Sequence, residues 1–102
     1  MPDEVLDALG NPERRRLVQR LADGPLSVTA LAEGFAISRP AISRHLATLE
    51  RAGLVTHRGV GNRNLYSLDP RGFAATRRWL DSFWDEAEVR LRLVAENLGT
   101  GE

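Results

Sequence analysis

Apolar residues recur at helical spacing through the first half of the chain, and glycine, proline and capping residues divide them into four short helices. The first is expected over about residues 3–10, and the second follows Asn11-Pro12 and stops at Asp23-Gly24-Pro25. The third runs over roughly Val28 to Gly34, and the fourth follows the N-cap Ser38 and stops at Gly53. Their apolar stripes are Val5, Leu6 and Leu9; Leu17, Val18 and Leu21; Leu31 and Phe35; and Ile42, Leu46 and Leu49.

After Gly53 the helical spacing gives way to short runs of branched and aromatic residues, which predict strands. Two such runs, 54–58 and 63–68, flank the glycine-containing loop 59–62 and together predict a β-hairpin. Asp69-Pro70 then repeats the combination of cap and proline and opens a long last helix, expected over about 70–98. Its apolar positions alternate in steps of four and three, as in the seam of a coiled coil: Leu80, Trp84, Ala87, Leu91, Val94 and Leu98.

These elements predict a mostly α fold of five helices with a small two-stranded β-hairpin. The order helix, turn, helix, hairpin is that of a winged helix-turn-helix, and 102 residues fit a single domain over residues 1–102. The chain has no cysteine, and no apolar run approaches the roughly 20 residues that cross a bilayer. We therefore expect no membrane association and a cytoplasmic location.

The net charge of zero conceals an uneven distribution along the chain. Residues 39–78 carry eight arginines and two acidic residues, a net charge of +6, whereas residues 1–38 and 79–102 carry −2 and −4. A basic segment between acidic ones is typical of a surface that binds nucleic acid. Charge alone leaves open the alternative of an ordinary solvated surface.

The basic segment supplies candidate DNA-binding residues on the fourth helix and the hairpin. With the apolar stripe of the fourth helix turned inward, Arg44 lies at the centre of its exposed face, where a guanidinium can donate two hydrogen bonds to guanine. Arg58 and Arg63 flank the hairpin loop and can reach phosphates or a minor groove. The residues expected to contact DNA are Ser38, Arg39, Pro40, Ala41, Ser43, Arg44, Arg58, Asn62 and Arg63.

Two stretches resemble signature sequences of the ArsR/SmtB family of bacterial winged-helix transcription regulators. Residues 11–17 read NPERRRL, and residues 38–55 read SRPAISRHLATLERAGLV, which fits the family pattern S-x-x-A-[IV]-S-x-H-L-x-x-L-x-x-A-G-L-V. The resemblance extends over nearly the whole chain. It implies a homodimer that binds operator DNA, usually as a repressor released by a signal, with an interface built from the first and last helices.

The last helix favours a partner on physical grounds as well. A chain of this length cannot easily bury the large apolar side chains that this helix carries on more than one face. The residues expected at a dimer interface are Val5, Leu6, Leu9, Leu80, Phe83, Trp84, Ala87, Leu91 and Val94. Two alternatives stay open. The aromatic residues pack only on their own domain, or the protein is a winged-helix module that binds other proteins and has weak or no specific DNA binding.

The chain departs from the metal-sensing members of the family. Residues 31–35 contain no cysteine, and the last helix contains no histidine. His45 is expected to pack or hydrogen-bond in the core and His57 to be exposed, and neither has a partner at ligand spacing. A metal site would need carboxylates such as Asp81, Asp85 and Glu88, which more often form a solvated helix face. Since no catalytic motif occurs either, we expect no enzyme activity, no metal and no cofactor, and the effector is not predicted.

Overall fold

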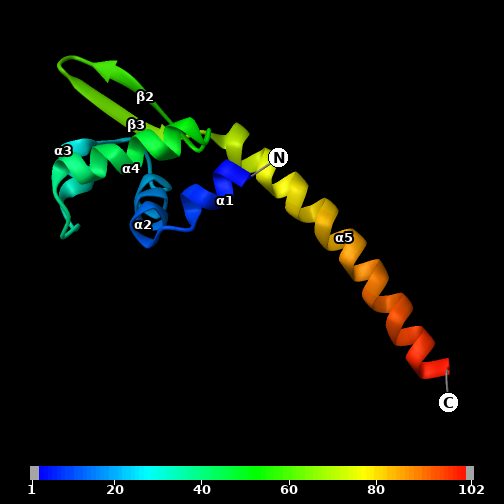
Figure 1. Ribbon diagram of the computed structural model, residues 1–102. Coiled ribbons are helices and arrows are strands. Elements are labelled where there is room, and N and C mark those ends of the chain that lie inside the picture. Colours follow the sequence, from blue (N-terminus) through cyan, green and yellow to red (C-terminus); the bar gives the residue numbers. More distant parts are fainter. Residues whose placement is uncertain (1–2, 101–102) are drawn as a thin grey trace.

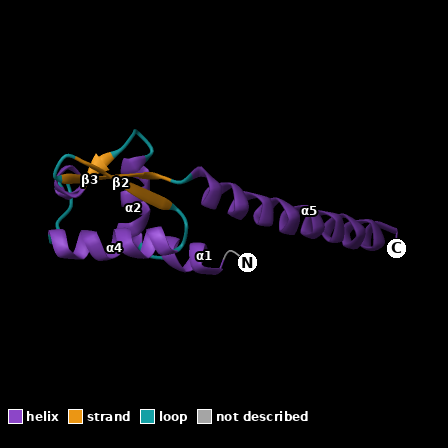
Figure 2. Ribbon diagram, turned by 90° about the horizontal axis from the view of Figure 1, so that it is seen from above, coloured by secondary structure: helices purple, strands orange, loops and turns teal. Residues whose placement is uncertain are grey.

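The computed structural model describes residues 3–100 of the chain. Four short helices and a small sheet form a body, and a long helix projects from it as a rod (Figures 1 and 2). The elements, in order, are α1 (Asp3–Leu9), α2 (Pro12–Leu21), β1 (Leu26–Ser27), α3 (Val28–Ala32), α4 (Arg39–Arg51), β2 (Val55–Val60), β3 (Arg63–Leu68) and α5 (Pro70–Thr100). The predicted winged helix-turn-helix with five helices is confirmed.

Side-chain caps fix where the short helices begin. Oδ1 of Asn11 accepts the backbone N–H groups of Glu13 and Arg14 at 2.9 and 3.1 Å, and Oγ of Ser38 accepts that of Ala41 at 3.3 Å. Both caps were expected from the sequence. The third helix ends at Ala32, two residues before its expected end, because the chain becomes extended at the next residue and then takes a positive φ.

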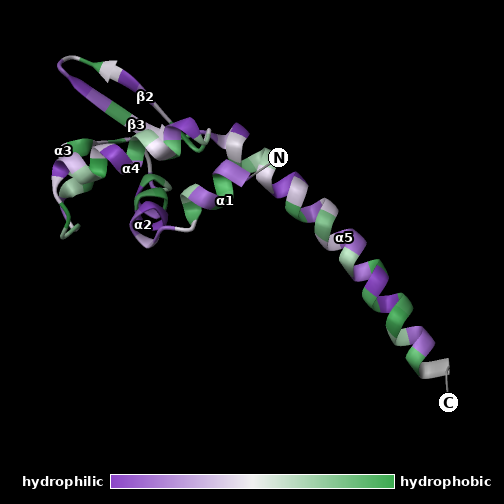
Figure 3. Cartoon of the chain, viewed as in Figure 1, coloured by the Kyte–Doolittle hydropathy of each residue, from purple (hydrophilic) through white to green (hydrophobic). Residues whose placement is uncertain are grey.

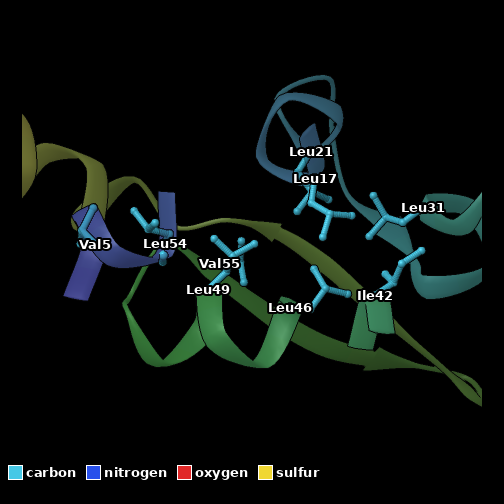
Figure 4. Close-up of a cluster of buried hydrophobic side chains, with 10 residues drawn as sticks. Val5, Leu17, Leu21, Leu31, Ile42, Leu46, Leu49, Leu54 and Val55 are labelled. Carbon is cyan, nitrogen blue, oxygen red and sulfur yellow. The ribbon is translucent and has the colours of Figure 1, made fainter. Parts of the chain in front are cut away.

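The core lies where α2, α3 and α4 meet the first residues after α4. Figure 4 shows the α4 side chains Ile42, Leu46 and Leu49 among the other large apolar residues of this cluster. The large side chains that are fully buried are Leu17, Leu31, Ile42, Leu46, Leu49, Leu54 and Val55. The apolar stripe predicted for the fourth helix is thus its buried face, which leaves the opposite face of α4 for solvent or a ligand.

The sheet has three antiparallel strands in the order β1-β3-β2, not the two that the sequence predicts. The additional strand, β1, pairs Leu26 with Tyr66 and Ser27 with Leu65. The predicted loop 59–62 is also too long, because the pairing of β2 with β3 continues to the pair Val60 and Arg63. This leaves a two-residue tip with φ of +64° at Gly61, which suits the first position of a type II′ turn.

Helix α5 is attached to the body only near its start. Its Gly72 lies so close to the backbone of Gly53 that a Cβ at this position would collide with the Gly53 carbonyl oxygen. Phe73 packs against the core, and Thr76 is buried and donates to the Gly72 carbonyl at 2.9 Å. From residue 77 to residue 98, nearly every side chain is exposed. Across residues 3–100, no helix is long and apolar enough to cross a membrane.

Candidate nucleic-acid interface

The N-terminal half of α4 presents most of the residues predicted to contact DNA. Since the apolar stripe of this helix is fully buried, its other face is turned to solvent. Exposed side chains there are Ser38, Arg39, Pro40, Ser43 and Arg44, whereas Ala41 is half-buried. Ser38 combines its exposed position with the capping hydrogen bond to the Ala41 amide.

The register of the hairpin, here called the wing (β2, β3 and the two-residue tip), places its two arginines on one face. Arg58 pairs with Leu65, and Arg63 pairs with Val60. Since side chains alternate between the faces of a strand, Arg58 and Arg63 share a face, and Asn62 lies exposed at the tip between the strands. The opposite face carries the buried or core-packed residues Val55, Tyr66 and Leu68. The wing arginines therefore lie on the face away from the core.

The arginines of this surface differ from most arginines of α5 in whether they have an acidic partner. Within residues 3–100, neither ion pairs nor side-chain hydrogen bonds engage the guanidinium groups of Arg39, Arg44, Arg58 and Arg63. Of the five arginines of α5, by contrast, four have an acidic partner: Arg71 with Asp69, Arg77 with Asp81, Arg90 with Glu86, and Arg92 with Glu88. The fifth, Arg78, forms no ion pair within residues 3–100. Within the described residues, most of the positive charge of α5 is thus paired, whereas the four guanidinium groups on α4 and the wing are free of ion pairs.

The two acidic residues of the basic segment are both engaged by neighbours. Oδ1 of Asp69 accepts the backbone N–H and the Nε–H of Arg71 at 3.0 and 3.1 Å, and the side-chain hydrogen bond from Arg71 holds the Asp69 pKa below its usual value. Oε1 of Glu50 lies 2.6 Å from Nδ1 of His57. Neither carboxylate is close enough to a free arginine of the surface to form an ion pair with it.

Two side-chain links in this region were missed by the sequence analysis. One is the contact of Glu50 with His57, which is exposed as expected. The other starts at Arg14, whose Nη1 lies 3.4 Å from Nδ1 of the half-buried His45. Burial, followed by the nearby Arg14, lowers the His45 pKa. Local spacing contains no signal for either link. Glu50 and His57 meet across the turn between α4 and β2, and Arg14 and His45 are brought together by the packing of α2 against α4 from 31 residues apart.

The residues predicted for a dimer interface divide into two groups. Of those on α1, Val5 is only 8% exposed and belongs to the core of its own chain, Leu9 is half-buried, and Leu6 is 42% exposed. The large side chains on α5, namely Leu80, Phe83, Trp84, Leu91 and Val94, are all exposed, and Ala87 is half-buried. Figure 3 shows apolar and polar residues alternating along the whole projecting helix.

The described residues contain no group of three or more His, Asp or Glu side chains that could hold a metal ion. Asp81, Asp85 and Glu88, which the sequence offers as possible ligands, are exposed or half-buried on α5. Asp81 and Glu88 instead pair with arginines of the same helix. The observed role of these two carboxylates is thus local charge pairing.

Comparisons with known proteins agree with this architecture. A family model described as a helix-turn-helix domain matches residues 9–58. Over 86 residues, the chain is 50% identical to the HTH-type transcriptional regulator Rv2034 of Mycobacterium tuberculosis. This match covers 84% of this chain and 80% of that protein. The chain is 29% identical to the transcriptional repressor SdpR of Bacillus subtilis over 84% of this chain and 96% of that protein.

A solved structure from Mycobacterium bovis, the 1–100 fragment of Mb0332, gives the same fold. It is described as a homodimeric winged helix-turn-helix DNA-binding domain of a possible ArsR-family regulator. It superposes with a TM-score of 0.66 at 28% identity, covering 83% of this chain and 79% of that one. The fold, the sequence of the fourth helix and these relatives lead to one assignment: the chain belongs to the ArsR family of winged helix-turn-helix transcriptional regulators.

Proposed function

We propose that this protein binds a palindromic operator as a homodimer and represses transcription there. The observation that carries the proposal is the set of four guanidinium groups on α4 and the wing that form no ion pair within residues 3–100, whereas four of the five arginines of α5 are paired. Free guanidinium groups suit phosphates and guanine edges, both of which accept two hydrogen bonds from one arginine. The name of the relative SdpR supports repression rather than activation.

In this proposal α4 is the recognition helix and lies in the major groove. Arg44, at the centre of its exposed face, donates to O6 and N7 of guanine. Arg39 and Ser43, with Ser38 at the cap, lie near the helix N-terminus, where side chains and backbone N–H groups hold phosphates. Pro40 and Ala41 are small and apolar enough to allow close approach and to contact a thymine methyl group.

The wing contacts DNA beside the recognition helix. Arg58 and Arg63 share one face of the hairpin, so both guanidinium groups can reach the same stretch of backbone or minor groove. Asn62 at the tip adds a hydrogen-bonding side chain next to them. The wing thereby supplies affinity and orientation, whereas α4 supplies most of the sequence readout.

The dimer is proposed to form through α1 and α5 of each chain. Leu6 offers the exposed apolar surface of α1, with Leu9 beside it. On α5 the proposed contacts are the seam residues Leu80, Trp84, Ala87, Leu91 and Val94, together with Phe83. A two-fold dimer presents two recognition helices about 34 Å apart to successive major grooves, which is why the operator is expected to be palindromic.

Replacement of Arg44 by alanine tests the readout role. We expect Arg44→Ala to weaken operator binding by about 1–3 kcal/mol and to relax the preference at one base pair. The control is Arg16→Ala, which removes the same charge from an exposed arginine that pairs with Glu13 on α2. Titration of labelled DNA from the upstream region of the protein's own gene, with an unrelated duplex as competitor, measures both. Equal affinities for Arg44→Ala and the unsubstituted protein would contradict the assignment.

The same titration at two salt concentrations tests DNA binding as the function. Neutralisation of several phosphates gives a steep decline of affinity with salt, with a log–log slope of about −0.9 per phosphate. A protein without preference for its upstream DNA would instead fit the protein-binding module that the exposed α5 allows. We propose neither enzyme activity nor a cofactor, in keeping with the regulators among the relatives, and we place the protein in the cytoplasm.

A further inference from the structure

The recognition helix and the wing are joined by one side-chain pair. Glu50 lies in the last turn of α4, and its Oε1 is 2.6 Å from Nδ1 of His57 on β2. The two side chains are 39% and 40% exposed. On β3, Tyr66 is the cross-strand partner of His57, and the two rings lie 5.2 Å apart between centroids with a tilt of 36°. The imidazole is therefore held by a carboxylate from α4 and an aromatic ring from the base of the wing.

Little else holds the outer part of the wing to the body. The short strand β1 pairs with Leu65 and Tyr66, and the strands beyond these residues are exposed. Among the residues that the structure describes, no other side-chain hydrogen bond or ion pair joins α4 to the hairpin. Within residues 3–100, Glu50 and His57 are thus the side-chain polar link between the recognition helix and the wing, in addition to the backbone pairing of β1 with β3.

The position of this pair along β2 determines where the wing arginines point. His57 and Arg58 are consecutive in the strand, so their side chains lie on opposite faces. When His57 is turned toward α4, Arg58 is turned outward, and Arg63 lies on the same outward face through its pairing with Val60. We propose that Glu50 and His57 are positioning residues, which hold the wing at the angle that brings Arg58 and Arg63 to the DNA bound by α4. This inference rests on the proposed function.

A purely electrostatic role for Glu50 predicts the opposite result from a positioning role. Glu50 is a negative group in the basic segment, and its charge alone repels phosphate. Its removal would then tighten DNA binding. If Glu50 instead holds the wing, its removal weakens binding, because the arginines of the wing lose their fixed position.

The test compares two single substitutions that remove the same charge. Glu50→Ala breaks the pair, whereas Glu33→Ala removes an exposed carboxylate that forms no ion pair within residues 3–100 and lies outside the wing. We expect Glu50→Ala to weaken operator binding about two- to fivefold, and Glu33→Ala to leave it unchanged or tighter. His57→Ala should match Glu50→Ala, and the double variant should be no weaker than either single one, because the two residues act as a unit.

A second measurement tests whether Glu50 affects DNA binding through the wing arginines Arg58 and Arg63. In a protein that carries Arg58→Ala and Arg63→Ala, the further change Glu50→Ala should leave the affinity unchanged or slightly higher, because only the charge of Glu50 is then removed. In the otherwise unsubstituted protein, Glu50→Ala should reduce the salt slope by about one phosphate contact. A merely structural role of Glu50 would weaken binding in both backgrounds.

Two results would overturn the positioning role of Glu50 and His57 while leaving the proposed function intact. In the first, Glu50→Ala tightens operator binding, as expected for removal of a charge alone. In the second, Glu50→Ala weakens binding equally in the unsubstituted protein and in the protein that carries Arg58→Ala and Arg63→Ala. Absence of operator binding by the unsubstituted protein would overturn the proposed function itself and this inference with it.

Discussion

At the scale of single residues, the backbone of α5 lies directly against the body at a position without a side chain. Gly72 lies in the first turn of α5, directly against the Gly53 carbonyl at the end of the recognition helix. Glycine inside a helix is normally a cost to stability relative to alanine, since it leaves the unfolded backbone more freedom. At residue 72 the absence of a Cβ is required by space.

Gly72→Ala is therefore expected to destabilise the protein, although replacing glycine by alanine in a helix usually stabilises. An unhindered change from glycine to alanine in a helix stabilises by up to about 1 kcal/mol, whereas overpacking against backbone costs about 1–3 kcal/mol. We expect the free energy of unfolding in urea to fall. Ala74→Gly, at an exposed position of the same helix, measures the ordinary difference between the two residues. A gain in stability for Gly72→Ala would show that the backbone at Gly53 can move to make room for the added Cβ.

His45 makes the stability of the protein depend on pH. Its pKa is lowered from 6.5 by burial and by Arg14 and Arg44, while Glu13 acts in the opposite direction. The unfolded chain therefore binds a proton at a higher pH than the folded one, so stability is full above about pH 6.5 and is lost as the pH falls through the lowered pKa.

We expect the melting temperature to decline below about pH 6.5 and a His45→Gln variant to decline less over the same range. Thermal unfolding followed by circular dichroism at several pH values, at constant ionic strength, measures this. Identical pH profiles for His45→Gln and the unsubstituted protein would remove His45 as the cause.

At the scale of elements, the recognition helix is the part that its sequence defines best. The Ser38 cap, the apolar stripe of Ile42, Leu46 and Leu49, and the glycine stop at Gly53 each act within one or two turns. Local interactions of this kind can be recognised from the spacing of residue types in the sequence. The helix, its buried face and the exposure of Arg44 could therefore be predicted before the fold was known.

The elements that sequence reasoning missed depend on contacts between distant parts of the chain. A two-residue strand such as β1 has no periodicity of its own and exists because Leu26 and Ser27 pair with β3. The hairpin tip is shorter than predicted, since Gly59 can extend a strand once a partner strand supplies hydrogen bonds. The same holds for Glu50 and His57, whose contact is created by the turn between α4 and β2.

At the scale of the whole molecule, the isolated chain is far from compact. Its radius of gyration is 18.9 Å and its longest dimension is 70 Å, whereas a compact domain of 100 residues has a radius of gyration of about 13 Å. The difference comes from α5, which extends beyond the body (Figure 2). Its large apolar side chains are exposed. A solitary helix of this kind gains little stability from its own hydrogen bonds, so packing against a second copy is the expected source of its order.

Substitutions at two nearby positions of α5 test which face of this helix forms the dimer contact. Leu91 lies on the proposed seam and Val89 does not, since residues two apart point to roughly opposite sides of a helix. Both are exposed in the single chain, at 62% and 55%. We expect Leu91→Glu to shift the protein toward monomer in sedimentation velocity and Val89→Glu to leave the dimer intact. Dissociation by Val89→Glu alone would place the interface on the other face.

The last turn of α1 is completed by side chains from α2. Nε of Arg14 donates to the Ala8 carbonyl at 2.6 Å, and Nη1 of Arg15 donates to the Leu9 carbonyl at 2.8 Å. A seven-residue helix is too short to persist alone in water, so the order of α1 depends on its contacts with α2. We therefore expect the surface around Leu6 to be available to a second chain only while α1 and α2 of the first chain are folded together, which would couple dimerisation to the stability of the monomer body.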